Sequence, residues 1–565
     1  MLLLVAGATQ AQDRGISPEQ ARRALPVDTM ITQSAQVTVK GEEVPYEVTT
    51  GTQPVYGDDD HAVASLHYTY YRRADVDDRA ERPLMISFNG GPGSGSLWMH
   101  LGYTSPKRLV ISDEGYPVQP YGVEDNEHSI IDVADVVYVN PVNTGFSRVI
   151  DEDTDPEQFF GVTADVDYLA DWIDTFVSRH NRWRSPKYLI GESYGTTRVA
   201  GLAGELQNSH WMYLNGVVLV SPTGLGMEPA GPSPRSEALK LPYYAATAWY
   251  HEQLPSNLQN RDLQGLLSEV ETYTVEQYIP AVTRGGFIDS TRRQTVAQQV
   301  ARYAGLSEQF VLNHNLAVPA DAFWKELLQG EGHTVGRLDS RYKGVDVKNA
   351  GDEYDYPAEL TSWNHAFTPA INHYLRDGLG FETDLQYNTF GNVYPWDDEE
   401  NDTGAQLRSA MAQNPFLHVM VQSGYYDGAT DYFSAKYVMW NLGTRQTMRD
   451  RLRFEGYRSG HMMYLRAEDL ATSNEDIRTF IEGSIPDDGM PARYGPDRWG
   501  IREGRHGAGP LLGVPRLYIA ATTFSMSSAV ITPRTSPSVV TKTRWMPPRC
   551  ITWAVCWTDV CSFTS

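Results

Sequence analysis

The stretch YLIGESYGTT, residues 188–197, passes from a strand-like run to a helix-like run through one tight turn. Residues 188–190 predict a short buried strand, and Thr197–Leu206 predict a helix. Gly191 and Gly195 flank Ser193, and glycines are needed where larger neighbouring side chains would clash in such a turn. The stretch therefore predicts a serine presented at the start of a helix, whose free N–H groups point toward developing negative charge.

Further strand-like and helix-like runs alternate along the chain around this turn. Asp165–Arg179 carries apolar residues at helical spacing, as a helix packed on a sheet does. Strands are expected at Gln36–Lys40, Ala64–Tyr71, Pro83–Phe88, Val133–Val139, Gly216–Val220, Phe416–Gln422 and Arg451–Phe454. This alternation predicts an α/β fold with a mostly parallel central sheet and helices on both faces.

A serine hydroxyl needs a base, and the base needs an orienting acid. In α/β-hydrolases these groups follow in the order Ser, Asp or Glu, His, each after a strand. Asp427 follows the expected strand 416–422, and His461 lies in a glycine-containing loop after the strand 451–454. An aspartate in a turn or a lone loop histidine means little by itself, but their order and positions predict a triad and an α/β-hydrolase fold.

An oxyanion hole needs one N–H after the nucleophile and one from the loop after an early strand. The residue after Ser193 is Tyr194, and the loop Asn89-Gly-Gly-Pro-Gly93 follows the expected strand 83–88. Gly91 is the residue of that loop expected to supply the second N–H.

Four ordered motifs give the chain a family resemblance. They are Phe88-Asn-Gly-Gly-Pro-Gly-Ser94, Asn140-Pro-Val-Asn-Thr-Gly-Phe-Ser147, Gly191-Glu-Ser-Tyr-Gly195 and Gly460-His-Met462. Together they resemble the successive signatures of the serine carboxypeptidases, over about residues 35–485, and most of all the bacterial members. The resemblance implies a hydrolase that releases C-terminal residues from peptides through an acyl-enzyme intermediate, without a cofactor.

The resemblance also implies roles for single residues. The nucleophile, its base and the orienting acid would be Ser193, His461 and Asp427; Gly91 and Tyr194 would form the oxyanion hole; Asn89 and Glu192 would bind the terminal carboxylate of the substrate. A carboxylate beside Glu192 makes a like-charge pair, so one member must be protonated. Activity favoured at acidic pH is therefore expected. The segment Trp98–Gly102 departs from the family, many of whose members have an acid there.

Two other functions stay open on the sequence. An esterase or an acyltransferase can use the same scaffold and triad, and a non-catalytic binding protein can keep the fold. No metal site is expected, because the chain lacks a His-Glu-x-x-His motif and has no cysteine before Cys550. A phosphate-binding loop is not found either.

The domain organisation is inferred from changes in composition and hydrophobic pattern along the 565 residues. Polar helices with many aromatic residues replace strand-like runs over 226–404, which we interpret as a helical cap insertion. The core then consists of residues 12–225, whose start to about 35 reads as a loose arm, and residues 405–485; residues 486–565 read as an irregular tail.

Charge and targeting signals limit the partners and the location. A formal net charge of −24 argues against nucleic acid, and peptides with a free C-terminal carboxylate are the expected substrates. Residues 1–11 resemble the second half of a signal peptide, cleaved after Ala11, which predicts a periplasmic or secreted protein. No apolar run reaches the roughly 18 residues of a membrane span. The sequence specifies neither the oligomeric state nor the preferred C-terminal residue.

Overall fold

The computed structural model describes residues 24–227, 231–443, 445–487 and 489–494, which belong to one compact unit of the chain. The expected signal-peptide segment and the tail beyond residue 494 lie outside the described residues.

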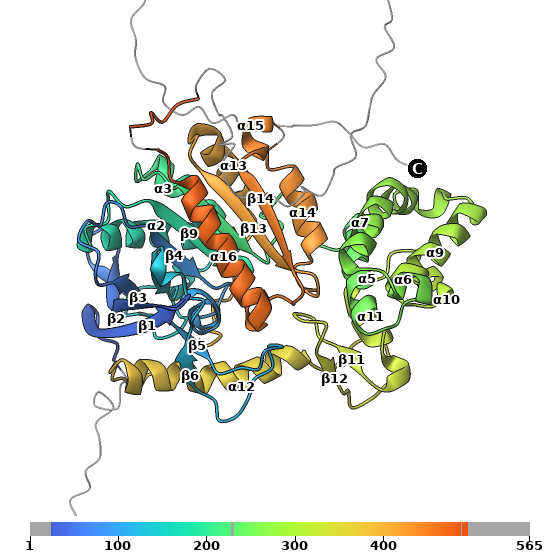
Figure 1. Ribbon diagram of the computed structural model, residues 1–565, viewed down its shortest axis with the longest axis horizontal. Helices are drawn as coiled ribbons and strands as arrows, with labels where there is room; N and C mark the ends of the chain where they lie inside the picture. The colour runs from blue at the N-terminus through green and yellow to red at the C-terminus, as the bar shows by residue number, and fades with distance from the viewer. Residues whose placement is uncertain (1–23, 228–230, 444, 488, 495–565) are drawn as a thin grey trace, which may run out of the picture. The chain divides into compact units, whose positions relative to one another are not determined.

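A ten-stranded sheet organises this unit (Figure 1). Nine strands form one row in the order β1-β2-β3-β7-β4-β9-β10-β13-β14, and β8 pairs with β3. β1, β2 and β3 pair antiparallel in turn, β3 is antiparallel to β7, and the six strands from β7 to β14 are parallel to one another. The strands are β1 (Thr29–Val39), β2 (Glu42–Tyr56), β3 (Ala62–Arg73), β4 (Leu84–Phe88), β7 (Asp135–Val139), β8 (Arg148–Val149), β9 (Lys187–Glu192), β10 (Gly216–Val220), β13 (His418–Gly424) and β14 (Leu452–Tyr457). The α/β-hydrolase fold expected from the sequence is confirmed.

The sheet is buried on both faces. In β10 alone, Val218 and Val220 belong to one apolar core, and Val217 and Leu219 to the other, as the twofold period of a strand requires. Because both faces are covered, such strands read as continuous apolar runs.

Helices form a layer on each face. α16 lies across the front of the strands in Figure 1 and shares a core with α1 and α12, whereas α2, α3, α13 and α14 contribute to the opposite core. These helices, with the short α15, are α1 (Leu97–Met99), α2 (Val162–Arg179), α3 (Tyr194–Asn208), α12 (Ala358–His373), α13 (Thr403–Gln413), α14 (Tyr432–Trp440), α15 (Gln446–Arg449) and α16 (Ala467–Ser484).

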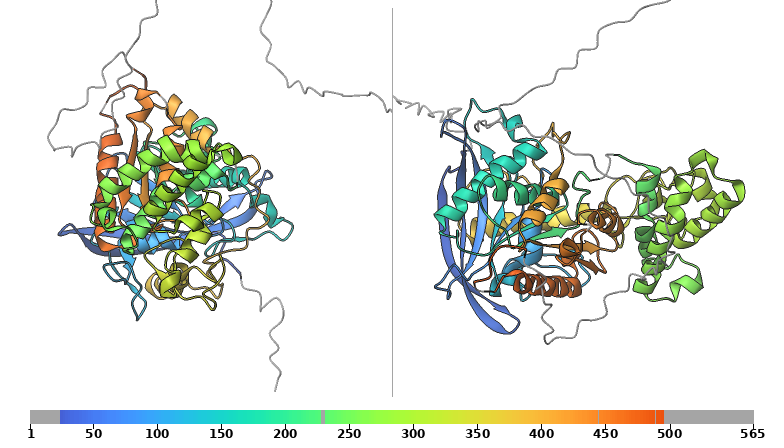
Figure 2. Two further views of the ribbon diagram at one scale, coloured as in Figure 1. Left: turned by 90° about the vertical axis from the view of Figure 1, so that its right-hand side faces the viewer. Right: turned by 90° about the horizontal axis from the view of Figure 1, so that it is seen from above.

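A third apolar core belongs to the inserted helices, which gather as one group beside the sheet (Figure 2). They are α4 (Pro234–Leu239), α5 (Leu241–Tyr250), α6 (Ser256–Gln259), α7 (Leu263–Tyr273), α8 (Ile279–Val282), α9 (Ser290–Ala304), α10 (Glu308–Asn313) and α11 (Ala320–Glu326). Local signals fix their ends: Asp289 caps α9 by accepting from the N–H of Arg292, and Gly305 ends it in the left-handed conformation.

The segment after these helices returns to the main core. A two-stranded hairpin, β11 (Thr334–Val335) and β12 (Lys343–Gly344), leads to α12, which packs under α1. A second small hairpin pairs β5 (Lys107–Leu109) with β6 (Val123–Asp125). The expected insertion over 226–404 thus holds helices of its own core and one helix of the main core; its limits stay a prediction.

The N-terminal arm is a correction. We expected a loose segment up to about residue 35, but β1 begins at Thr29 and pairs with the long strand β2. Pro45, Gly51 and Pro54 interrupt β2, which is why it was not expected: proline and glycine weaken strand propensity. In the structure Gly51 lets β1 approach, because a Cβ there would lie 1.9 Å from the carbonyl oxygen of Thr29.

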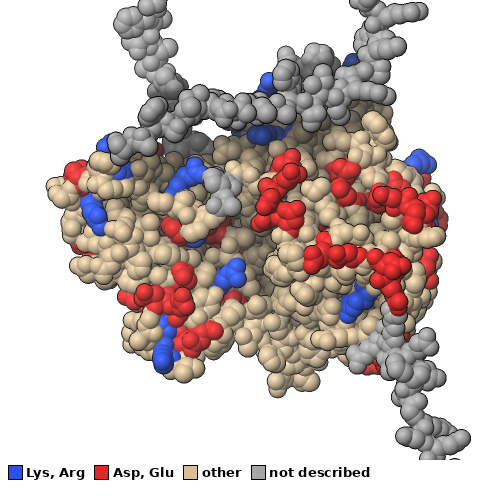
Figure 3. Space-filling view, turned by 180° about the vertical axis from the view of Figure 1, so that it is seen from behind, with Lys and Arg blue, Asp and Glu red and all other residues tan. Residues whose placement is uncertain are grey.

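The surface reflects the acidic composition. On the face shown in Figure 3, patches of Asp and Glu are larger than those of Lys and Arg. Within the described ranges, no helix is both long and apolar enough to cross a membrane.

Candidate active site

Ser193 lies in the turn between β9 and α3, where its backbone is strained. Its φ of 56° and ψ of −125° are unusual for a residue other than glycine. A Cβ at Gly191 would lie 2.1 Å from the carbonyl oxygen of Gly195, so the flanking glycines are needed for the turn to close. The arrangement presents the serine at the helix N-terminus, as the sequence predicts.

Asp427 and His461 follow the carboxyl ends of β13 and β14, the two strands beyond β10 in the row. His461 Nδ1 lies 2.7 Å from Asp427 Oδ2, and both side chains are buried. The other carboxylate oxygen of Asp427 accepts from the N–H groups of Ala429 and Thr430 at 2.9 and 3.1 Å. Asp427 is therefore fixed in the orientation that a triad acid needs.

Two residues that the sequence analysis did not single out connect the halves of this group. The N–H of Ser193 donates to Val220 at the end of β10, and the hydroxyl of the next residue, Ser221, donates to the carbonyl of His461 at 2.8 Å. The Thr430 hydroxyl lies 2.8 Å from both the Ser221 carbonyl and Asp427 Oδ2. Ser and Thr recur so often in loops that no sequence signal marks these two.

The charged groups around His461 raise its pKa. Burial lowers the pKa of His461, but the charge and hydrogen bond of Asp427 outweigh burial, and the pKa lies above its ordinary value. Glu192 acts in the same direction.

The loop carrying Gly91 lies directly against the nucleophile turn. A Cβ on Gly90 would lie 2.5 Å from the Tyr194 nitrogen and 2.7 Å from the Glu192 carbonyl oxygen. Tyr194 begins α3, so its N–H has no partner within the helix. The structure thus brings both expected oxyanion-hole residues to the same place; their roles stay predictions.

Glu192 is buried beside these groups. Its Oε1 accepts from the Tyr464 hydroxyl at 2.8 Å, and its Oε2 accepts from the Asn89 amide. Burial raises the pKa of Glu192 to about 7, against the opposing effects of His461 and these two hydrogen bonds. A carboxyl of this kind changes its charge near neutral pH.

Tyr464 is a third residue that the sequence analysis did not single out. It lies three residues after His461, and its partner is visible only in three dimensions. Its ring stacks on Tyr103 with centroids 4.7 Å apart, and the stack directs its hydroxyl at Glu192. It is an uncharged donor to Glu192.

We find no arrangement of three or more His, Cys, Asp or Glu side chains suited to a metal ion among the described residues. The groups assembled here are a serine at a helix N-terminus, a histidine oriented by a buried aspartate, and a carboxyl poised near neutral pH. Such a set can carry out acyl transfer by a serine nucleophile.

Known proteins share part of the sequence. A family model described as serine carboxypeptidase matches residues 47–223. Serine carboxypeptidase-like 8 of Arabidopsis thaliana is 25% identical over 171 residues, 30% of this chain and 37% of its own; serine carboxypeptidase-like 10 of the same plant is 25% identical over 190 residues, 32% of this chain and 40% of its own. The chain thus spans about two fifths of the length of the curated relatives it matches.

Among solved structures, Kex1(delta)p, a prohormone-processing carboxypeptidase from Saccharomyces cerevisiae, is similar with a TM-score of 0.46 and 14% identity, over 77% of this chain and 91% of its own. The range matched by the family model includes β3, β4, β7, β9 and β10 and the turn that carries Ser193. Over residues 47–223 the chain is similar to the serine carboxypeptidase family.

Proposed function

We propose that this protein is a serine-type carboxypeptidase that releases C-terminal residues from peptides and is favoured at acidic pH. The observation that carries the proposal is Glu192: a buried carboxyl, poised near neutral pH, one residue before the nucleophile. An enzyme that only needed to cleave an internal bond or an ester would gain nothing from a charge that varies at this position.

The proposed chemistry uses the chain's own groups. Ser193 Oγ attacks the last peptide carbonyl while His461 takes its proton, and the N–H groups of Gly91 and Tyr194 stabilise the oxyanion. His461 then gives the proton to the leaving amine, which departs as a free amino acid. Water, deprotonated by His461, attacks the acyl-enzyme ester and regenerates Ser193.

Substrate selection is assigned to Asn89 and Glu192. A protonated Glu192 can donate to the terminal carboxylate of the substrate, whereas an ionised one repels it. Since the pKa of Glu192 is about 7, binding of the free acid should weaken as the pH rises through that value. The effect should appear in KM, because the repulsion acts on the bound substrate as much as on the transition state.

The test compares a blocked dipeptide with a free carboxylate and its C-terminal amide between about pH 4 and pH 8. Preferred cleavage of the free acid at low pH, lost in Ser193→Ala, supports the proposal. In Glu192→Gln the KM should no longer depend on pH. Equal cleavage of acid and amide, or reaction with simple esters alone, would instead favour an esterase or acyltransferase; no turnover at all would favour a binding protein.

The proposal includes a periplasmic or secreted location. A body without cysteine before Cys550 is compatible with it. Fractionation of the native cells tests the location, and recovery of the protein with the cytosol would contradict it.

A further inference from the structure

The loop of the β11–β12 hairpin, residues 336–342 (the hairpin loop), contacts both loops that carry the candidate base and acid. The carbonyl of Leu338 accepts from the N–H of His461 at 2.6 Å. The carbonyl of Arg337 accepts from the N–H of Gly428, next to Asp427, at 2.9 Å. Two successive carbonyls of one loop therefore hold the backbone on each side of the Asp427–His461 pair.

Other contacts make this arrangement specific. The N–H of Ser340 donates to the carbonyl of Tyr426 at 2.9 Å, on the Asp427 side. On the His461 side, a Cβ at Gly460 would lie 2.5 Å from that of Asp339, so the two loops touch with no space for a side chain. The hairpin loop is thus packed closely against the loops that carry Asp427 and His461.

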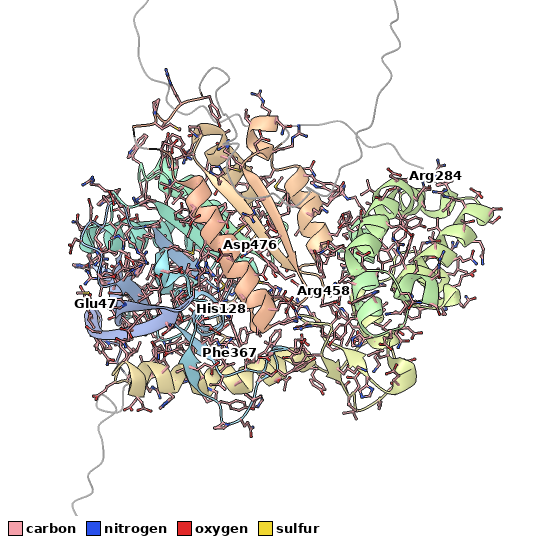
Figure 4. All side chains as sticks on the ribbon, viewed as in Figure 1. Glu47, His128, Arg284, Phe367, Arg458 and Asp476 are labelled. Atoms are coloured by element: carbon pink, nitrogen blue, oxygen red, sulfur yellow. The ribbon has the colours of Figure 1, made fainter. Side chains whose placement is uncertain are left out.

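The inserted helices hold the same two loops from another direction. In α5, Thr247 shares a hydrogen bond of 2.7 Å with the Ser340 hydroxyl. The guanidinium of Arg458, in the loop after β14, lies 5.8 Å from the ring centroid of Trp249; Figure 4 labels Arg458 where the strand ends meet the inserted segment. The loop of His461 therefore lies between the hairpin loop and α5.

Glu359, in the first turn of α12, supports the hairpin loop from below. Its Oε1 accepts from the N–H of Leu338 at 2.7 Å, so one residue links the Glu359 carboxyl to the backbone of His461. Its Oε2 is buried and has no hydrogen-bond partner among the described residues. A buried carboxylate with one oxygen unpaired costs far more free energy than a neutral carboxyl in the same place.

α12 itself is firmly placed, so Glu359 has little freedom to move. Its Trp363 is buried in the main apolar core, and its Phe367, labelled in Figure 4, meets Trp98 with ring centroids 4.7 Å apart. Relief of an unfavourable charge must then come from the hairpin loop.

We propose that Glu359 is a positioning residue, whose neutral carboxyl keeps the hairpin loop against His461 and whose ionisation loosens that contact. The inference rests on the proposed function only in taking Ser193 as a nucleophile that His461 activates; it does not require cleavage of peptides. Glu359 would then be a second carboxyl, besides Glu192, whose protonation raises activity at acidic pH. Glu192 would act on substrate binding, whereas Glu359 would act on the position of His461.

Burial, more than the surrounding charges, determines the pKa of Glu359. Burial raises the pKa of Glu359 to about 7; the N–H of Leu338 and the charge of Arg337 oppose the rise, and Asp339 adds to it. Asp339 is paired with the buried Arg341 at 2.6 Å, and Tyr354 also interacts with Glu359. His461 is flanked by Asp427, Glu192 and Arg337.

The experiment measures how fast an organofluorophosphonate labels Ser193 of the full chain from pH 6 to pH 9. In that reaction a Ser193 oxygen–phosphorus bond forms, fluoride leaves and His461 takes the proton; no peptide or carboxylate is needed. At one unit above a pKa of about 7, roughly one carboxyl in eleven is protonated. If only the neutral form is competent, wild type should be labelled about tenfold more slowly than Glu359→Gln at pH 8, and at a similar rate at pH 6.

Glu359→Ala removes the acceptor for Leu338 and should be slow at every pH, so that Gln rescues and Ala does not. The matched control is Glu382→Gln, an exposed glutamate beyond the end of the same helix, which should behave as wild type. Parallel pH profiles for wild type and Glu359→Gln would overturn the inference, even if their melting temperatures differ. A wild type that is labelled but releases no C-terminal residue contradicts the proposed function and leaves this test intact.

Discussion

The two halves of the candidate site are held in different ways. Ser193, with Glu192 and Tyr194, lies in a turn built by neighbours in the sequence and by close glycine contacts. Asp427 and His461 are held by a hairpin loop more than 80 residues upstream of either, through backbone carbonyls. The nucleophile half is thus held by the sheet and by the loop after β4, whereas the base half depends on the inserted segment.

This difference has a consequence for variation. A substitution in the inserted segment should displace His461 and Asp427 more than Ser193. Loss of the hairpin-loop contacts should leave a serine that is well placed but poorly activated, because the nucleophile is inert without its oriented base.

The largest expected effect comes from Asp427→Asn. The amide cannot stabilise the imidazolium of His461 and favours the wrong tautomer, which costs about 10⁴-fold in kcat in a triad enzyme. Steady-state kinetics on the free-acid dipeptide measure it, with circular dichroism as the check that the fold is kept. A loss below about tenfold would show that Asp427 does not orient the base.

The next largest effect is on stability and concerns a buried ion pair of the hairpin loop. Arg341 and Asp339 are an ion pair with both side chains 2% exposed. Arg341→Met leaves Asp339 buried and unpaired, and should lower the free energy of unfolding by about 3–5 kcal/mol. Urea denaturation measures it. The matched control is Lys40→Met, whose pair with Glu475 is about half exposed on both sides and should cost less than about 1 kcal/mol; equal losses in the two variants would contradict the special weight given to the hairpin loop.

The nucleophile half is tested by Gly90→Ala. The new Cβ would collide with the backbone at Tyr194 and Glu192, so the loop or the turn must shift. A displacement of about 1 Å in a catalytic group can cost about 100-fold in rate. The variant should lose activity on acid and amide substrates alike, because the oxyanion hole serves both; a selective loss on the free acid would instead place the damage in carboxylate binding.

The same contrast explains what the sequence could predict. The turn at Ser193 and the parallel strands β9, β10 and β13 were predictable because their signals are local: apolar runs, flanking glycines and the change to helical period. β2 was not, since two prolines and a glycine mask a strand whose register depends on its partners. For the hairpin loop no pattern could have served, because its carbonyls contact the triad loops and every residue has a carbonyl.

Among the candidate site residues, the positions of Ser193, Asp427 and His461 followed from their order and the strands before them. The supporting residues Tyr464, Thr430 and Glu359 did not, because their importance depends on burial and on partners far away in the chain. A buried carboxyl and an exposed one look the same in sequence, and only the fold makes the pKa of Glu359 different from that of an ordinary glutamate.

The smallest expected effect measures how much one side-chain hydrogen bond to Asp427 contributes to activity. Thr430 donates one hydrogen bond to Asp427 Oδ2 at 2.8 Å, while two backbone N–H groups hold the other oxygen. Thr430→Val keeps the shape and removes that donor, and a hydrogen bond to a charged group contributes about 1.5–3 kcal/mol. Since the remaining bonds still hold the aspartate, we expect the lower end of this range, a fall in kcat of about tenfold with KM unchanged. Thr430→Ser retains the hydroxyl and should keep most of the activity. If the serine variant falls as far as the valine variant, the methyl group and not the hydrogen bond is what Asp427 needs, and the base half is held by packing instead of by polar contacts.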